Sequence, residues 1–348
     1  MNSVRNLSIF CRYGENGASS RLRFFRYRPY FERAGINVEI SSFFNDAYLQ
    51  KLYAGQKRSL LTLPAAFVER GRDILDAYED STFLIEYELF PMLGANLEKL
   101  LLRNRRFFLN YDDPVWEKYA KIPFLKNKYD ILVKSASGVI VANDMLAERF
   151  GKLNSNILKV PTAVDLDHYV SAAGSVKKFP RFTVVWIGTP ATFPYLQNFA
   201  PVLKKMAEVC DFELLMIGKS SWTLPGVPCR SVEWNEETEA ELLARSHVGI
   251  MPLPDESFAR GKSAYKLIQY AAARIPALGS PVGENNKVIR HGETGFLCDS
   301  AENWCDSLKK LYDSTDLRDA MGKAAGVLAS DWSIEKHAAR VIDFIFPE

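Results

Sequence analysis

The sequence predicts a parallel α/β protein built from two doubly wound domains, and three observations support this. The chain has 348 residues, which is too long for one ordinary core and suits two domains of about 150–180 residues. Short apolar runs alternate with amphipathic helical stretches, the order of elements that forms parallel sheets. A hydrophobic share of 47% and a charged share of 25% are those of a folded globular protein.

The first domain is predicted from its apolar runs, which end in small or polar residues. A loop of small residues, 14–20, follows the first run, and a basic helix over 21–35 ends at Gly35. A second helix is expected over 144–151. The strands are expected at 7–13, 37–43, 81–87, 106–112, 138–143 and, as a shorter element, within 157–165.

A stretch of small, charged and proline residues at 171–180 interrupts this alternation and is interpreted as the linker. We therefore expect a first domain over 1–172, a linker over 173–180, a second domain over 181–330 and a terminal helix over 331–348 that packs back on the first domain. In the second domain strands are expected at 181–188, 212–218, 229–234, 247–253 and 275–282, and helices at 198–210, 237–246, 262–274 and 303–346.

Composition excludes several classes of protein. The net charge of +2 provides no overall field for a nucleic acid. No run reaches the roughly 18–20 apolar residues that span a bilayer, and the first residues lack a signal-peptide pattern. The five cysteines and four histidines are scattered without metal-ligand spacing. We expect a cytoplasmic protein without metal or cofactor, while contact with the inner face of the membrane stays open.

The most informative segment is 247–297, HVGIMPLPDESFARGKSAYKLIQYAAARIPALGSPVGENNKVIRHGETGFL. A strand ends at Pro252 and a helix is expected to open near Ser263, where free N–H groups and the helix dipole favour phosphate. Lys262 and Lys266 are four residues apart, which predicts that they share one helix face. The alternative is that both are solvated surface lysines.

This segment resembles the C-terminal domain of retaining GT-B glycosyltransferases of family 4, the glycosyl transferases group 1 type. The likeness lies in the strand-Pro, loop and helix, then in A-A-x-I-P-A, S-P-V-G and H-G-E-T-G-F-L. Residues 137–169, SGVIVANDMLAERFGKLNSNILKVPTAVDLDHY, resemble the family's last N-terminal strand, helix and P-x-x-V-D signature. The resemblance implies a GT-B fold of two Rossmann-like domains facing a cleft.

The same resemblance implies a function. It is that of a metal-independent hexosyltransferase, which moves a sugar from a nucleotide-diphosphate sugar to a hydroxyl of a saccharide or lipid-linked acceptor. Bacterial surface-polysaccharide or glycoconjugate synthesis is the pathway class that it suggests. Two alternatives stay open, namely a catalytically silent nucleotide-sugar-binding or scaffold relative, and an inverting GT-B enzyme or epimerase. A dehydrogenase is disfavoured because no G-x-G-x-x-G follows the first strand.

One departure from the family concerns two glutamates separated by seven residues, which flank the donor sugar and the ribose. At the matching positions this chain has Gly261 and Gln269. The resemblance then implies that Gln269 hydrogen-bonds the ribose, and that Asp255 or Glu256 replaces the sugar-facing glutamate.

The turn after the strand at 181–188 is the other expected donor element. Gly188 allows a close backbone approach to phosphate because it has no Cβ. The basic residues that the family usually carries after this turn are absent, so the charge is expected from Arg260, Lys262 and Lys266. The expected donor-binding residues are Gly188, Thr189, Thr192, Tyr195, Asp255, Arg260, Gly261, Lys262, Ser263, Lys266 and Gln269.

Two aspartates after the strand at 106–112 are the candidate catalytic residues. Asp112 and Asp113 are expected to meet the acceptor hydroxyl or the donor sugar. The alternative is a turn role, since Asp before Pro114 commonly starts turns. Glu86 and Glu88, at another strand end, are weaker candidates. The loop after the first strand is expected against the diphosphate or the acceptor, or is a plain surface turn; its residues are Gly17, Ala18, Ser19 and Arg21.

Overall fold

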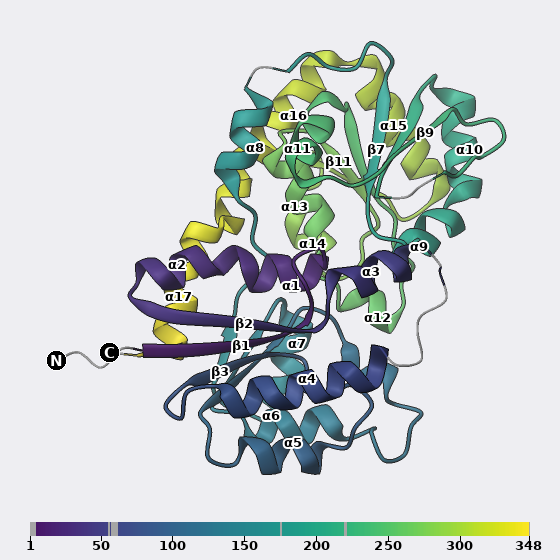
Figure 1. Cartoon of the computed structure of the whole chain (residues 1–348). Coiled ribbons are helices and arrows are strands. Elements are labelled where there is room, and N and C mark those ends of the chain that lie inside the picture. Colours follow the sequence, from purple (N-terminus) through teal and green to yellow (C-terminus); the bar gives the residue numbers. More distant parts are fainter. Residues whose placement is uncertain (1–4, 55, 57–61, 175, 219–220, 348) are drawn as a thin grey trace. The chain divides into compact units, whose positions relative to one another are not determined.

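The computed structural model describes residues 5–54, 56, 62–174, 176–218 and 221–347. The chain forms two compact units (Figure 1). The first unit comprises Met1–Ala163, Gly261–Ser263 and Ile334–Glu348, and the second comprises Val164–Arg260 and Ala264–Ser333.

The change of unit at residue 164 differs from the expected linker at 173–180. Helix α8 (Leu166–Ala173) belongs to the second unit, where Tyr169 is buried in the core and hydrogen-bonds Glu239 of α11 (Glu236–Arg245). The terminal helix α17 (Ile334–Ile345) belongs to the first unit. Its apolar face, which includes Val341, is buried against the sheet of that unit.

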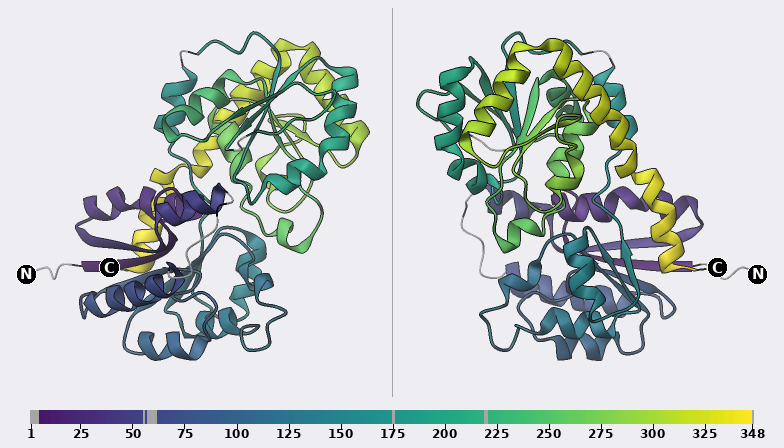
Figure 2. Two further views of the ribbon diagram at one scale, coloured as in Figure 1. Left: turned by 45° about the vertical axis from the view of Figure 1, so that its right-hand side comes forward. Right: turned by 180° about the vertical axis from the view of Figure 1, so that it is seen from behind.

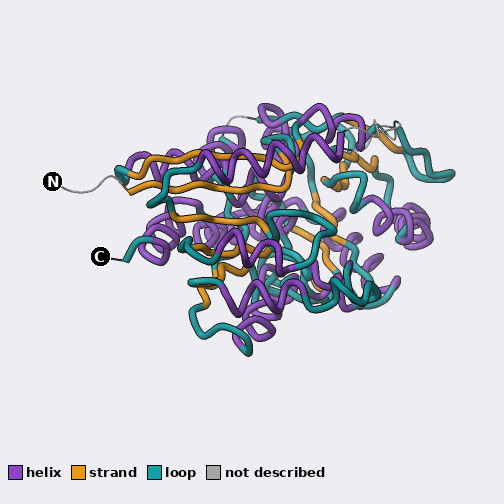
Figure 3. Tube along the Cα trace, turned by 60° about the horizontal axis from the view of Figure 1, so that its bottom comes forward, coloured by secondary structure: helices purple, strands orange, loops and turns teal. Residues whose placement is uncertain are grey.

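The first unit contains a six-stranded sheet in the order β2-β1-β3-β4-β5-β6, with every neighbouring pair parallel. Figure 3 shows these strands running side by side. The prediction of six parallel strands in this unit is confirmed, with ends shifted by a few residues. The strands are β1 (Arg5–Tyr13), β2 (Ile36–Phe44), β3 (Thr82–Glu86), β4 (Phe107–Tyr111), β5 (Gly138–Val141) and β6 (Ile157–Lys159).

Helices cover both faces of this sheet. The expected helix over 21–35 is broken into α1 (Ala18–Arg23), a 3₁₀ turn η1 (Phe25–Tyr27) and α2 (Arg28–Arg33). Phe24 and Phe31 from this segment share one core with α17. The opposite face is covered by α4 (Thr62–Asp76), α5 (Ala95–Leu102), α6 (Lys128–Ser135) and α7 (Asp144–Gly151). The remaining short elements are α3 (Asp46–Tyr53) and η2 (Val115–Lys118).

The second unit contains another parallel sheet, in the order β12-β11-β10-β7-β8-β9. Five of these strands were predicted. β12 was not, because its three residues are too few to show a period. The strands are β7 (Thr183–Ile187), β8 (Glu213–Ile217), β9 (Cys229–Val232), β10 (Val248–Met251), β11 (Ala277–Gly279) and β12 (Gly295–Leu297).

The second sheet is also covered on both faces (Figure 2). The expected continuous helix over 303–346 is divided, because Ser314 has extended backbone and its hydroxyl caps α16 by accepting from Leu317 N. Ser333 has extended backbone too and separates α17. The helices, besides α8 and α11, are α9 (Phe193–Asn198), α10 (Ala200–Val209), α12 (Ser257–Arg260), α13 (Tyr265–Ala272), α14 (Asn285–Val288), α15 (Ala301–Asp313), α16 (Thr315–Leu328) and the 3₁₀ turn η3 (Ala329–Trp332).

In both sheets all strands point the same way, so their carboxyl ends meet along one edge. Ligands of doubly wound domains bind outside this edge. None of the helices within the described ranges combines the length and the apolar character that a bilayer span requires.

Candidate functional site

The carboxyl edge of the first sheet carries a buried cluster of carboxylates and hydroxyls. Glu86 ends β3 and Asp112 follows β4. The Ser19 hydroxyl, at the start of α1, lies 2.7 Å from Glu86 Oε1 and 2.8 Å from Asp112 Oδ2. Ser20 donates to Glu86 Oε2 at 2.6 Å, and the Tyr87 hydroxyl donates to Asp112 Oδ1. Because Ser19 has one hydroxyl hydrogen, it bonds one carboxylate at a time.

Two carboxylates this close compete for ionisation. Burial raises the pKa of Glu86, and the neighbouring Asp112 charge raises it further, while hydrogen bonds from Ser20, the Arg12 N–H and Ser19 oppose the rise. Burial and the Asp112 charge also raise the pKa of Tyr87, which keeps its hydroxyl protonated as a donor. The cluster therefore holds an acceptor carboxylate, Asp112, beside a group that binds a proton more readily than an ordinary glutamate.

The backbone at Tyr87 turns this edge sharply. Tyr87 has a φ of +63°, a left-handed conformation that an L-residue adopts at a cost of order 1–3 kcal/mol.

The residue after this turn, Glu88, belongs to a separate buried ionic group. Glu88 Oε2 lies 2.6 Å from Lys128 Nζ, and Lys128 Nζ also lies 2.7 Å from Glu98 Oε1. Both carboxylates and the lysine are almost completely buried.

The predicted loop residues border the cluster of Glu86 and Asp112. Gly17 is the N-cap of α1, and a Cβ there would lie 2.4 Å from Tyr13 Cβ, so a side chain at this position would displace β1 or the helix. Ala18 begins α1, and Ser19 is in contact with both carboxylates as described. Arg21 is buried and donates to the Glu15 carbonyl at 3.2 Å. The structure thus places Ser19 within the cluster and uses Arg21 to hold the loop.

Asp113 lies one residue beyond the cluster. Its carboxylate lies 3.8 Å from Lys262 Nζ, and both residues belong to the first unit. Gly261 belongs to this unit too, and its carbonyl accepts from Asn143 Nδ2 at 2.6 Å. A Cβ at Gly261 would lie 2.8 Å from Pro114 Cγ. This contact leaves no room for a larger side chain at position 261 unless Pro114 moves.

The expectation that Lys262 and Lys266 share one helix face is wrong. Helix α13 begins at Tyr265, and its N-cap Ala264 is left-handed with φ 53°. Because of this conformation the helix does not extend back to Lys262 and Ser263. Both residues precede the helix and lie in the first unit. Lys266 alone stands in the first turn of α13.

The carboxyl edge of β7 forms the centre of the second candidate site. The Lys266 ammonium lies 5.6 Å from the centre of the Trp186 ring. A Cβ on Gly188 would lie 2.5 Å from that ring and 2.6 Å from Thr192 Oγ1. The Thr192 hydroxyl donates to the Thr189 carbonyl at 3.1 Å and closes the turn between these two residues. Gly188 and Thr192 therefore lie beside the Trp186 ring at this strand end, and Lys266 lies near the same ring. These residue types suit a phosphate group.

The next predicted donor residues are Arg260 and Asp255, which pair with each other, and Tyr195. Arg260 forms two hydrogen bonds with the Asp255 carboxylate, of 2.6 and 3.0 Å. Its hydrogen bond lowers the pKa of Asp255. Both side chains are exposed, so this pair neutralises itself at the surface. Tyr195 is half-buried in α9 and packs against the core of the second unit.

Gln269 is buried within α13. Its Nε2 donates to the Tyr169 hydroxyl at 2.9 Å, and Tyr169 in turn donates to Glu239 at 2.9 Å. One N–H of the amide is therefore engaged in the core, which leaves the second N–H and the carbonyl oxygen for a ribose hydroxyl. The ribose contact stays a prediction.

The first similarity to known proteins lies in the second unit. Residues 181–314 match the family model "Glycosyl transferases group 1". The structure of Anabaena Alr3699/HepE in complex with UDP is similar over 97% of this chain and 98% of its own, with a TM-score of 0.70 and 13% identity. That of WaaG, a glycosyltransferase involved in lipopolysaccharide biosynthesis, has a TM-score of 0.66 and 13% identity over 99% and 100% of the two chains. The fold is GT-B. At such identities the likeness shows the fold alone.

The GT-B architecture explains the two similar sheets, since each is one Rossmann-like half.

Among curated proteins, the D-inositol 3-phosphate glycosyltransferase of Pseudarthrobacter chlorophenolicus is 36% identical over 90 residues. This match covers 25% of the present chain and 20% of the relative. The chain thus spans about a fifth of the length of the curated relatives it matches. Residues 181–314 therefore match a group 1 glycosyl transferase domain, and the whole chain has a GT-B fold.

Sequence reasoning missed several residues that shape these GT-B edges. Tyr87 escaped notice because a tyrosine beside a strand carries no spacing signal, and Ser20 was noted only as a member of the small-residue loop 14–20. Trp186 was interpreted only as part of an apolar strand. Glu86 was a weak candidate from its position at a strand end, and the structure makes it the centre of the first cluster. In the described part of the chain, no three His, Cys, Asp or Glu side chains gather as metal ligands would.

Proposed function

We propose that this protein is a retaining hexosyltransferase that moves a sugar from a nucleotide-diphosphate sugar to a hydroxyl of a saccharide or lipid-linked acceptor. The observation that carries the proposal is that Gly188, Thr192 and Lys266 gather around the Trp186 ring at the β7 edge, within the segment that matches the group 1 model. The fold likeness to a structure in complex with UDP is consistent with it.

The second unit would bind the donor. The backbone at Gly188 and the first turn of α13 would receive the diphosphate, and Lys266 would add a positive charge. Negative charge on the diphosphate grows as the glycosidic bond breaks, so these groups would stabilise the transition state more than the ground state. Because this charge comes from side chain and backbone, we propose a reaction that needs no divalent ion.

The first unit would supply the sugar or acceptor side of the reaction. Asp112 presents a carboxylate that Ser19 and Tyr87 hold in place, which suits it to accept a hydrogen bond from a reacting hydroxyl. Glu86 orients Ser19 and is a positioning residue. Asp113 remains a second candidate, with Lys262 near it.

The test is a transfer assay across UDP-, GDP- and dTDP-sugars with a panel of saccharide and lipid-linked acceptors, with and without EDTA. The proposal expects one nucleotide-sugar to support turnover that EDTA leaves unchanged, and a product that keeps the donor's anomeric configuration by NMR. Tight donor binding without turnover on any acceptor would favour the silent relative. Inverted product would overturn retention but not transfer.

Lys266→Ala should weaken nucleoside diphosphate binding roughly 10- to 150-fold, because one charge-assisted contact is worth about 1.5–3 kcal/mol. Calorimetric titration measures this change. The matched control is Lys204→Ala, which removes an exposed lysine of α10 and should alter affinity by less than about twofold. If Lys266→Ala binds like the control, the donor site is not at the β7 edge.

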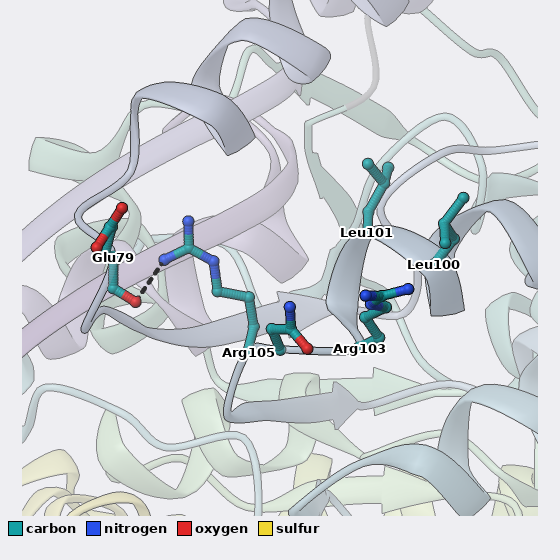
Figure 4. Close-up of a pocket in the computed structure, with 6 residues that line it drawn as sticks. Glu79, Leu100, Leu101, Arg103 and Arg105 are labelled. Carbon is teal, nitrogen blue, oxygen red and sulfur yellow. Dashed lines mark hydrogen bonds between the residues drawn. The ribbon is translucent and has the colours of Figure 1, made fainter.

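We further propose a cytoplasmic protein that touches the inner face of the bacterial membrane during surface-polysaccharide or glycoconjugate synthesis. A shallow depression of about 430 Å³ lies at the end of α5. Figure 4 shows Leu100, Leu101, Arg103 and Arg105 around it, with Arg105 donating to the Glu79 carbonyl at 2.8 Å. Leu100 is 61% exposed. Exposed apolar side chains beside arginines suit an anionic lipid surface.

Leu100→Glu should therefore lower binding to vesicles of phosphatidylglycerol and phosphatidylethanolamine roughly tenfold, since it replaces an inserted apolar side chain by a repelled charge. Co-sedimentation measures the bound fraction. The control Val327→Glu changes an exposed valine of the second unit and should bind as the wild type does. Equal binding of all three proteins would rule out contact through α5.

A further inference from the structure

The second unit contains a pocket away from its candidate donor edge. It has a volume of about 220 Å³ and lies at the amino edge of the sheet, because His247 immediately precedes β10 and Pro276 immediately precedes β11. Gly188 lies at the other end of the strands, after the last residue of β7. This amino-edge pocket is therefore separate from the site proposed for the donor.

Two of its cations are held by neutral groups. Lys178 Nζ donates to the Ser246 carbonyl at 2.8 Å. The Arg318 guanidinium donates to the Tyr312 carbonyl at 3.1 Å and to Thr315 Oγ1 at 2.8 Å. These bonds orient both groups without cancelling their charge. Lys178 also donates to the Ala244 carbonyl and Arg318 to the Leu311 carbonyl, which leaves one N–H on Lys178 and two on Arg318.

The third cation, Arg274, is positioned by glycines of α16. A Cβ on Gly326 would lie 2.7 Å from Arg274 Cγ, and one on Gly322 would lie 2.3 Å from the Arg274 carbonyl oxygen. The two glycines share a helix face with Arg318 and Asp319 by their spacing of three and four residues. Arg274 is exposed, and within the described ranges no hydrogen bond or ion pair engages its guanidinium.

His247 adds a neutral donor. Its Nδ1 accepts from the Thr183 N–H at 3.0 Å, so the neutral ring carries its proton on Nε2. Burial and the charges of Lys178 and Arg318 lower its pKa to about 4. Burial, with the Arg318 charge, lowers the pKa of Lys178 to about 8, against the opposing effect of Asp319.

We propose that the amino-edge pocket binds a phosphate dianion, either free phosphate or the phosphate group of a small phosphomonoester. Three cationic residues and His247 line the pocket, and Asp319 is the single carboxylate among its lining residues. A dianion would balance the excess charge and accept the remaining donors. The volume exceeds that of phosphate alone and leaves room for a small organic group. The proposal does not depend on the glycosyltransferase function.

The test is calorimetric titration of the whole protein with inorganic phosphate and, separately, with glucose 6-phosphate, at constant ionic strength and pH 8. Arg274→Ala should weaken binding roughly tenfold, because it removes a charge-assisted contact. Asp319→Asn should tighten it roughly threefold, because it removes the opposing charge. Lys204→Ala, an exposed lysine of α10, is the matched control and should bind as the wild type does.

Proton uptake gives a second readout. A bound dianion raises the pKa of Lys178 from about 8, so binding at pH 8 should take up protons, seen as a heat that varies with the buffer's ionisation enthalpy. Tighter binding of one titrant identifies the source of the phosphate group. The proposal fails if neither titrant binds at about 10 mM, if Arg274→Ala and Asp319→Asn bind like the wild type, or if saturating nucleoside diphosphate abolishes the binding.

Discussion

Replacing Asp112 by asparagine is expected to lower turnover by a factor of about 100 to 10,000, the range for loss of a positioned proton-accepting group. The fold should survive. The asparagine Oδ1 can still accept from Tyr87, and its Nδ2 can donate to Ser19 while Ser19 donates to Glu86, so the hydrogen bonds are preserved with one direction reversed. Initial rates at saturating donor measure the effect.

Two companion measurements separate chemistry from structure. Donor affinity of Asp112→Asn by calorimetry should stay within about twofold of wild type, because the donor is proposed to bind the second unit. Asp76→Asn, an exposed position on α4, serves as the matched control with unchanged turnover. Turnover reduced by less than about threefold would assign Asp112 to the turn before Pro114 instead.

The second large effect concerns stability. Lys128→Met should lower the free energy of unfolding by about 3–5 kcal/mol, because it removes one partner of a buried ionic group. Lys128 Nζ contacts Glu88, Glu98 and the Phe90 carbonyl, the last at 2.6 Å. Without it, buried Glu98 loses its cation, and Glu88 keeps only Arg12, whose guanidinium lies 3.5 Å from Glu88 Oε1. Urea unfolding followed by circular dichroism measures the loss.

The loss of stability in Lys128→Met should depend on pH, and its direction follows from the pKa of Glu98. Burial already raises the pKa of Glu98, against the Lys128 charge, and loss of the lysine should raise it further. A carboxyl group with a raised folded-state pKa contributes stability below its ordinary pKa and loses it as pH rises through the folded value. The deficit of Lys128→Met should therefore be larger at pH 7.5 than at pH 5.

Two further variants test that interpretation. Adding Glu98→Gln to Lys128→Met should recover part of the loss, since it removes the unbalanced charge of Glu98. Lys126→Met, two residues away and exposed, should change stability by less than about 0.5 kcal/mol. A loss below about 1 kcal/mol for Lys128→Met would show that the buried network contributes little.

The strands were predictable because the signal for them is local. Residues 82–86, TFLIE, are all buried, and a short continuous apolar run is what a strand covered on both faces requires. The helix over 144–151 was equally plain, since Asn143 accepts from Leu146 N as its cap. Helix breaks were harder. Ala264 takes a left-handed conformation that its sequence does not signal, and this removed Lys262 from the helix.

The candidate site was only partly predictable, because its residues are defined by partners far apart in the chain. Lys128 has the sequence context of a surface lysine, yet Glu88 and Glu98 from other elements enclose it. Gln269 was expected to face a ligand, and Tyr169, 100 residues earlier, engages it in the core. No periodicity records such pairings.

The α/β class, the parallel strands and the segment 247–297, whose residues resemble a donor-binding domain, follow from the sequence alone. Each of these depends on hydrophobic periodicity or on motifs that are contiguous in the chain. The folded chain was needed to show that Ser19 lies between Glu86 and Asp112, that Lys266 stands over Trp186, and that the amino-edge pocket exists. The reason is that a carboxylate's charge state and a lysine's burial depend on neighbours that folding brings together from distant positions.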